Sequence, residues 1–197
     1  MLKKTLLAAV VLGLSTTAVQ ANEVSGYVTG SMGQTDSKGF DTNNKLGYKI
    51  AVGLQANQYV ALEAQYTDLG KPKDKASGRA LVNGVPVNVN VKGTAETRGL
   101  GANLVGTLPL DDFKLFAKVG YHRLETKVKG TATASALGVS YSEKFSGKER
   151  EWVPSFGAGA SYAIMPELEI IAEYERYKSV ADDYDVDFAS VGLRYNF

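Results

Sequence analysis

The sequence contains no cysteine and a single histidine, His122. Without cysteine the chain can form neither a disulfide scaffold nor the thiolate centres used in redox catalysis and zinc binding. The acidic residues and His122 show no metal-ligand spacing, and no glycine-rich phosphate loop stands between a strand and a helix. We therefore expect neither a metal nor a cofactor.

The sequence also lacks an excess of charge of either sign. It has 22 lysines and arginines against 21 aspartates and glutamates, a net charge of +1. A protein that binds nucleic acid over its whole surface carries a clear basic excess. The composition therefore argues against nucleic acid as a partner, although it leaves room for local patches of charge.

No apolar run reaches the roughly 20 residues that a helix needs to span a bilayer. The apolar run from Leu6 to Leu14 follows Lys3 and Lys4 and precedes the small-residue sequence Val19-Gln20-Ala21. This order is typical of a secretory signal peptide rather than of a membrane anchor.

We expect residues 1–21 to be cleaved and residues 22–197 to form one domain, because no linker rich in proline or serine divides them. Removal of the two lysines near the start leaves 20 basic against 21 acidic residues, a net charge of −1. The 21 glycines, the 11 tyrosines and the absence of helical periodicity indicate an all-β fold.

The mature sequence does show alternation with a period of two, most clearly from Asp185 to Phe197. One face of that segment is apolar and ends in aromatic residues, whereas the other face is small or polar. Seven earlier segments alternate in a similar way, which predicts about eight strands. The expected strands cover residues 24–34, 46–54, 60–67, 99–104, 113–122, 152–162, 170–175 and 185–197.

The connections between these strands are alternately long and short, the pattern of an up-and-down barrel in an outer membrane. We expect the two longest, residues 69–96 and 126–148, to be solvated loops, with an alternating piece and an Asn83-Gly84 hairpin in the first and a strand-prone stretch near residues 137–141 in the second. The same pattern places both termini on the periplasmic side.

Three segments resemble strands of the membrane domain of the outer-membrane protein A (OmpA) family and its OmpX-like small-barrel relatives: residues 26–30, 156–163 and 172–174. The resemblance implies an all-β, eight-stranded antiparallel up-and-down transmembrane β-barrel in the cell outer membrane of a Gram-negative bacterium. It also implies a monomer that meets outer-membrane lipids, the barrel assembly machinery and periplasmic chaperones, with Tyr195 and Phe197 of the closing strand as the assembly signal. Because the sequence ends at Phe197, we expect no peptidoglycan-binding domain.

A soluble barrel of the lipocalin type is the alternative, because alternation alone does not say which face points outwards. The polar set is rich in glycine and serine, which suits the narrow interior of an eight-stranded barrel. Aromatic residues stand at both ends of the apolar faces, as in the girdles of membrane barrels. Both features favour the membrane barrel.

Charged residues of both signs belong to the inward set. The interior polar network is expected to contain Lys49, Glu63, Lys118, Glu173, Glu175 and Arg194. Charges removed from water must pair or cost several kcal/mol each, so we expect a network that plugs the barrel. The alternative is a small porin-like channel for ions or small solutes, lined by the same residues.

A lipid A-modifying enzyme is a less favoured alternative. Such an enzyme needs a nucleophile held by a base, and His122 has no closely spaced serine beside it. We therefore expect no catalytic residues. The expected function is envelope integrity and surface interaction through extracellular loops, with a host surface or another extracellular ligand as the partner.

Three arginines belong to the outward set near the long connections: Arg98, Arg123 and Arg176. Guanidinium groups can hold phosphate bidentately, which predicts a lipopolysaccharide-binding rim. The simpler interpretation is that these cations snorkel to the headgroups.

Overall fold

The computed structural model describes residues 25–37, 45–71, 73–82, 85–136, 139–180 and 184–197. The expected signal peptide, residues 1–21, lies outside the described residues. Nine antiparallel strands make up almost all of the described chain: β1 (Ser25–Ser37), β2 (Lys45–Asn57), β3 (Val60–Asp68), β4 (Lys73–Val82), β5 (Val85–Leu110), β6 (Phe113–Ala136), β7 (Val139–Met165), β8 (Leu168–Val180) and β9 (Tyr184–Asn196). Among these residues no helix is long and apolar enough to cross a membrane.

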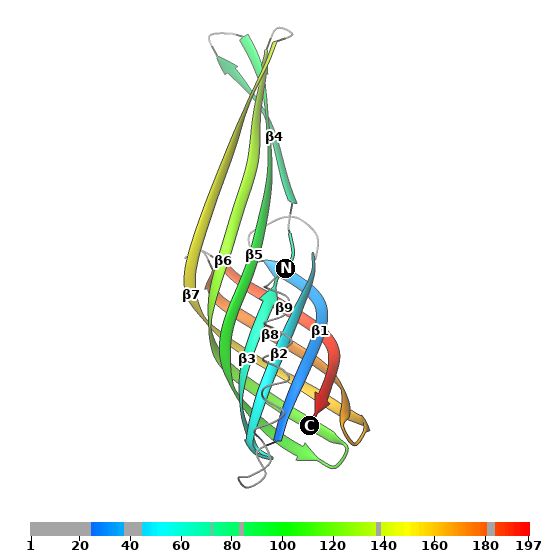
Figure 1. Ribbon diagram of the computed structural model, residues 1–197. Helices are drawn as coiled ribbons and strands as arrows, with labels where there is room; N and C mark the ends of the chain where they lie inside the picture. The colour runs from blue at the N-terminus through cyan, green and yellow to red at the C-terminus, as the bar shows by residue number, and fades with distance from the viewer. Residues whose placement is uncertain (1–24, 38–44, 72, 83–84, 137–138, 181–183) are drawn as a thin grey trace, which may run out of the picture.

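Eight of the strands close into a ring (Figure 1). They pair in the order β3, β2, β1, β9, β8, β7, β6 and β5, and β5 pairs in turn with β3. The first and last strands lie side by side, with Tyr27 opposite Asn196 and Met32 opposite Val191. Strand β4 stands outside the ring and pairs with β5. The expected eight-stranded antiparallel up-and-down barrel is therefore confirmed.

Alternation along each strand sends one set of side chains into the ring and the other set outwards. On β8, Ile171, Glu173 and Glu175 are buried, whereas Ile170 and Tyr174 are exposed on the outer wall. Apolar and aromatic side chains cover that wall, which is far more apolar surface than a water-facing barrel exposes. A polar interior inside an apolar wall fits a barrel surrounded by lipid and contradicts the lipocalin-type alternative.

Aromatic pairs mark the end of the outer wall from which the longest strands continue, which we call the upper end. Tyr121 stacks on Trp152 with ring centroids 5.6 Å apart. Tyr48 meets Tyr66 at 6.3 Å. The opposite, lower end carries the short turns and the exposed rings of Phe113, Tyr162, Tyr195 and Phe197. The two ends thus match the aromatic girdles of a membrane barrel.

The glycines of the inward set make room for large side chains on neighbouring strands. A Cβ atom on Gly53 would lie 2.1 Å from the ring of Tyr27, and one on Gly159 would lie 2.4 Å from the ring of Phe116. No real side chain tolerates such a contact. The glycine-rich pattern therefore reflects how tightly the narrow interior is filled.

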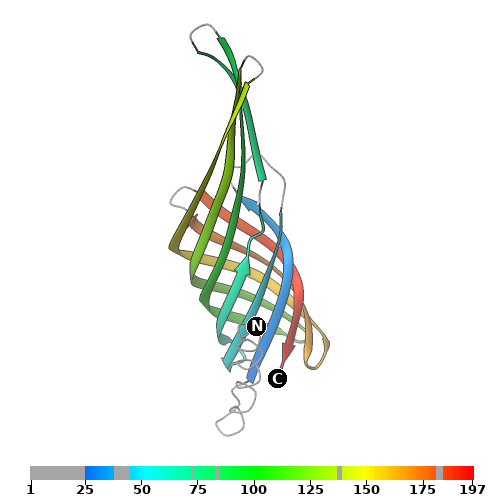
Figure 2. The same cartoon turned by 45° about the horizontal axis from the view of Figure 1, so that its top comes forward.

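The strands β5, β6 and β7 run well beyond the ring, with 26, 24 and 27 residues. Together with β4 they form a four-stranded sheet that rises above the upper end (Figures 1 and 2). We call this the distal sheet. It comprises residues 73–82, 85–98, 125–136 and 139–150.

The expectation of solvated loops over residues 69–96 and 126–148 was wrong, because most of both segments is strand. Serine, threonine and lysine give these segments the composition of loops. However, valines at every second position from Val87 to Val91 and the β-branched threonines of β6 favour strand, and the continuous pairing of β5 with β6 satisfies the backbone. Val82 pairs with Val85, which agrees with the hairpin predicted from the Asn-Gly pair between them.

Candidate functional site

The barrel interior is built in layers, which can be followed along β8. Above the buried Glu169 near the lower end, its inward residues are Ile171, then Glu173 and Glu175, then Tyr177. Each belongs to a larger group. The lower apolar layer consists of Tyr27, Ala61, Val105, Phe116 and Ile171. The upper apolar layer consists of Leu69, Leu124, Val153, Tyr177, Val180, Val186 and Phe188. Between them lies a polar layer of Lys49, Glu63, Gln65, Asn103, Lys118, His122, Glu173 and Glu175.

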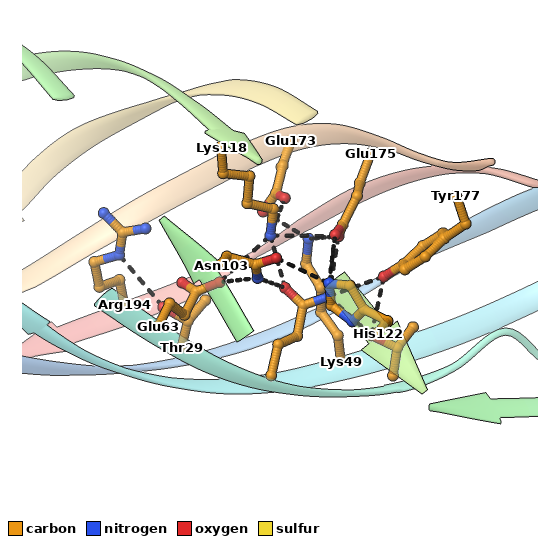
Figure 3. A network of polar contacts seen from close by, with 12 residues as sticks. Thr29, Lys49, Glu63, Asn103, Lys118, His122, Glu173, Glu175, Tyr177 and Arg194 are labelled. Carbon is orange, nitrogen blue, oxygen red and sulfur yellow. Dashed lines mark hydrogen bonds and ion pairs between the residues drawn. The ribbon is translucent and has the colours of Figure 1, made fainter. Parts of the chain in front are cut away.

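Lys118 lies at the centre of the polar layer (Figure 3). Its ammonium forms ion pairs with Glu63 at 3.4 Å, with Glu175 at 3.3 Å and with Glu173. A second lysine, Lys49, pairs with Glu173 at 2.6 Å and with Glu175 at 3.3 Å. Two ammonium groups are thus shared among three carboxylates from two strands, β3 and β8.

Amide side chains complete these pairings. Asn103 donates to Glu63 at 2.9 Å and to the carbonyl of Gln65 at 3.0 Å, and that carbonyl also accepts from Lys118 at 2.7 Å. The amide nitrogen of Gln65 donates to Glu175 at 3.1 Å. Glu63 and Glu175 therefore receive neutral donors as well as cations, which reduces the cost of burying them.

A tyrosine from each apolar layer bonds to the polar layer. The hydroxyl of Tyr27 donates to Glu63 at 2.9 Å from the lower side. The hydroxyl of Tyr177 accepts from Gln65 at 2.9 Å from the upper side. Each ring lies in an apolar layer while its hydroxyl reaches polar partners, which is the usual arrangement of a buried tyrosine.

Arg194 lies apart from the five other residues of the expected interior network. Its guanidinium lies 4.3 Å from the ring centroid of Tyr27 and 5.3 Å from that of Phe116, within the lower apolar layer. It donates to Thr29 at 3.3 Å and lies 3.8 Å from Glu169. Ring faces and one distant carboxylate, rather than the central glutamates, therefore surround this cation.

The central charges of the polar layer have almost no exposure. Lys49 is 2% exposed, Lys118 is 3% exposed and Glu175 is 0% exposed. They lie between the two apolar layers.

His122 is part of the polar layer. Its Nε2 lies 2.8 Å from the side-chain oxygen of Asn103 and 3.8 Å from Glu175, and its ring meets that of Tyr177 edge-on at 5.2 Å. Its Nδ1 is buried without a hydrogen-bond partner among the described residues. The side chain is 0% exposed.

The three rim arginines differ in their partners. Arg98 pairs with Asp68 at 2.9 Å and with Glu96. Arg176 donates to both carboxylate oxygens of Asp187, at 2.5 and 2.8 Å. Of the three, only Arg123 has no ion pair with a carboxylate of the described chain, and it is exposed on the outer wall. Two of the three expected phosphate ligands are thus already neutralised.

The closing strand ends at the lower girdle. Tyr195 and Phe197 are 51% and 39% exposed on the outer wall. The backbone of Phe197 exchanges two hydrogen bonds with Gly26, at 2.8 and 2.9 Å. The last residue is therefore paired with the first strand, and its ring is free to face lipid.

The distal sheet is a second candidate site, which reasoning from the sequence missed because both segments were taken as loops. The period-two alternation of its valines was the available signal. Near its base Glu125 accepts from Arg150 at 2.6 Å and pairs with Lys148 and Lys127 at 3.0 Å each. These cations, Arg150 first, hold the pKa of Glu125 well below its usual value, at about 2.

Comparison with known proteins places this architecture in a family. The family model for the outer membrane protein beta-barrel domain matches residues 5–197. The chain belongs to this family. Its location in the cell outer membrane and its resemblance to OmpA-like barrels are thereby confirmed.

Outer membrane protein A of Escherichia coli O157:H7 is 28% identical over 215 residues, which cover 100% of this chain and 55% of that protein. Outer membrane protein P5 of Haemophilus influenzae is 26% identical over 156 residues, covering 76% of this chain and 38% of that protein. The chain thus spans about half the length, or less, of these outer-membrane relatives. Among solved structures, the N-terminal beta-barrel domain of Pseudomonas aeruginosa OprF matches with a TM-score of 0.53 and 11% identity, over 90% of this chain and 100% of that domain, which shows a shared fold.

Proposed function

We propose that this outer-membrane protein is a closed, non-conducting barrel that supports envelope integrity and holds the distal sheet outside the cell as a surface for interaction. The observation that carries the proposal is the layered interior, in which paired charges with almost no exposure lie between two apolar layers. An eight-stranded barrel leaves an interior that side chains can fill completely. The porin-like alternative requires a continuous water path, so the low exposure of these charges supports the closed barrel.

The orientation in the membrane is part of the proposal. Barrels of this kind have short turns on the periplasmic side and longer segments outside the cell. Here the connections at the lower end are short, such as the one from Leu110 to Phe113, whereas the distal sheet extends from the upper end. This arrangement supports an extracellular distal sheet and periplasmic termini, with residues 1–21 acting as the export signal.

Partners in assembly and in the lipid bilayer follow from the location. We infer that periplasmic chaperones and the barrel assembly machinery recognise the closing strand through Tyr195 and Phe197, whose rings are exposed at the lower girdle. We also infer that lipopolysaccharide meets the upper rim, where Arg123 has no carboxylate partner among the described residues. The buried environment of His122 supports a protein that is not an enzyme.

Single cysteines test the orientation cleanly, because the chain has none of its own. Ser142→Cys places a thiol on the exposed distal sheet, and Glu167→Cys places one in an exposed lower turn. We expect a membrane-impermeant maleimide to label Ser142→Cys in intact cells and Glu167→Cys only after the outer membrane is permeabilised. The reverse pattern would overturn the proposed orientation.

A further inference from the structure

The two faces of the distal sheet differ in chemistry. One face carries the valines and alanines of β5 and β6 together with Tyr141 and Phe145 of β7. The other face continues the outward set of the barrel wall and is polar and basic. Because strand register fixes which side chains are neighbours, this basic face can be read as a series of rows across β5, β6 and β7.

The two rows nearest the barrel contain carboxylates as well as cations. The first contains Arg98, Glu125 and Arg150, and the second contains Glu96, Lys127 and Lys148. Each of the four cations in these rows forms an ion pair with Glu96, Glu125 or Asp68. Every cation in the part of the face that is closest to the membrane thus has a carboxylate partner.

The next two rows carry cations without acidic partners. Lys129 lies between Thr94 and Ser146 in the third row, and Thr131 lies between Lys92 and Lys144 in the fourth. All three lysines are exposed, and none forms an ion pair with a carboxylate in the part of the chain that the structure describes. Lys129 is the diagonal neighbour of both other lysines, so three unpaired positive charges gather in these two rows.

One groove on the basic face is lined by these six residues, Lys92, Thr94, Lys129, Thr131, Lys144 and Ser146, together with Gly130 and Phe145. Neighbouring strands lie about 4.8 Å apart, so the backbones of Lys92 and Lys144, two strands apart, are separated by roughly 10 Å. Lys129 lies on the strand between them, and along the strand direction it is two residues, or about 7 Å, nearer the barrel. Three ammonium groups are thus spread along an open groove. The hydroxyl groups of the two threonines and the serine lie between them.

We propose that this groove binds an anionic polysaccharide, through ammonium groups on its sulfate or carboxylate groups and hydroxyls on its sugar hydroxyls. An open groove of this width does not enclose a single small anion, whereas it can meet several charges of one extended chain. Lysine is a mobile point charge and does not demand the bidentate geometry that arginine provides. The proposal rests on the proposed function, since it names the class of partner for the distal sheet.

The position of the groove argues against the phosphates of the protein's own lipid leaflet. Lys129 lies eight residues beyond Tyr121 of the upper girdle, about 26 Å of extended strand. The chemistry of the groove also argues against single-stranded nucleic acid, because the aromatic rings that would stack on bases, Tyr141 and Phe145, belong to the opposite face.

Binding of dextran sulfate and of polygalacturonate to folded protein in detergent micelles tests the proposal, with neutral dextran as the uncharged probe. We expect both polyanions to bind in a salt-sensitive way and dextran not to bind. Lys92→Gln, Lys129→Gln and Lys144→Gln together should weaken dextran sulfate binding on the order of 100-fold, at about fivefold per lysine. The matched control is Lys127→Gln, Lys148→Gln and Lys178→Gln, which removes the same charge from lysines that are ion-paired.

An equal loss in both triple variants would show that net charge alone governs binding and would overturn the site. Tighter binding of single-stranded DNA than of dextran sulfate, or stronger competition by purified lipopolysaccharide than by dextran sulfate of equal charge, would also overturn it. Heat-modifiable migration on gels verifies that each variant is folded. Since binding in micelles does not depend on orientation, failure here is distinguishable from failure of the cysteine-labelling experiment.

Discussion

Replacement of Lys118 by alanine should destabilise the barrel severely. Lys118 contacts Glu63, Glu173 and Glu175, all of which are buried. Its removal leaves these three carboxylates with Lys49 as the only cation of the polar layer. Because breaking a buried ion pair on one side leaves charge uncompensated, we expect a loss of roughly 3–5 kcal/mol in the free energy of unfolding.

Urea unfolding of refolded protein in micelles, followed by heat-modifiable migration, measures this loss. Lys127→Ala is the control, since it removes an exposed partner of Glu125 and should cost under about 1 kcal/mol. A Lys118→Met, Glu173→Gln double variant removes one charge of each sign and keeps most of the volume, so it should recover much of the stability lost by Lys118→Met alone. If Lys118→Ala behaved like Lys127→Ala, the assignment of a buried, mutually dependent network would be refuted.

Three further outcomes follow from the geometry. Gly53→Ala should lower the free energy of unfolding by about 1–3 kcal/mol, because its Cβ meets the Tyr27 ring. Gly30→Ala should be nearly neutral in the same urea assay, because no heavy atom lies within 4 Å of its Cβ. The pKa of Glu125 is depressed to about 2, so its stabilisation of the distal sheet is present above about pH 4.5 and is lost as the pH falls towards 2; proteolysis of the sheet by pepsin should increase over that range in wild type, and Glu125→Gln should remove the dependence. Deletion of Phe197 should reduce folded yield in cells far more than the stability of refolded protein, since one rim aromatic contributes only about 1–3 kcal/mol, and equal losses in both assays would contradict a role in assembly.

Much of the barrel could be predicted from the sequence, because a period of two assigns each residue to one of only two faces. That parity places Lys49, Glu63 and Lys118 inside before any coordinates are known. The pairings could not be predicted, since Lys118 of β6 meets Glu63 of β3 and Glu175 of β8 only through the register of the closed ring.

The carboxylate partners of Arg98 and Arg176 could not be predicted from the sequence for the same reason. Asp68 lies opposite Arg98 across β3 and β5, and Asp187 lies opposite Arg176 across β8 and β9. A sequence shows the arginine and its parity but not the carboxylate on the neighbouring strand. The distal sheet was missed because threonine, serine and lysine are as common in loops as on the exposed face of a sheet.

Conductance in planar lipid bilayers tests the central claim most directly. Protein whose folded state has been verified by heat-modifiable migration should insert without producing reproducible conductance steps, while a general porin in the same membrane confirms that channels are detected. Clean, ion-selective steps from the folded wild type would show that water and ions pass Lys49, Lys118 and Glu175, and would contradict a closed barrel.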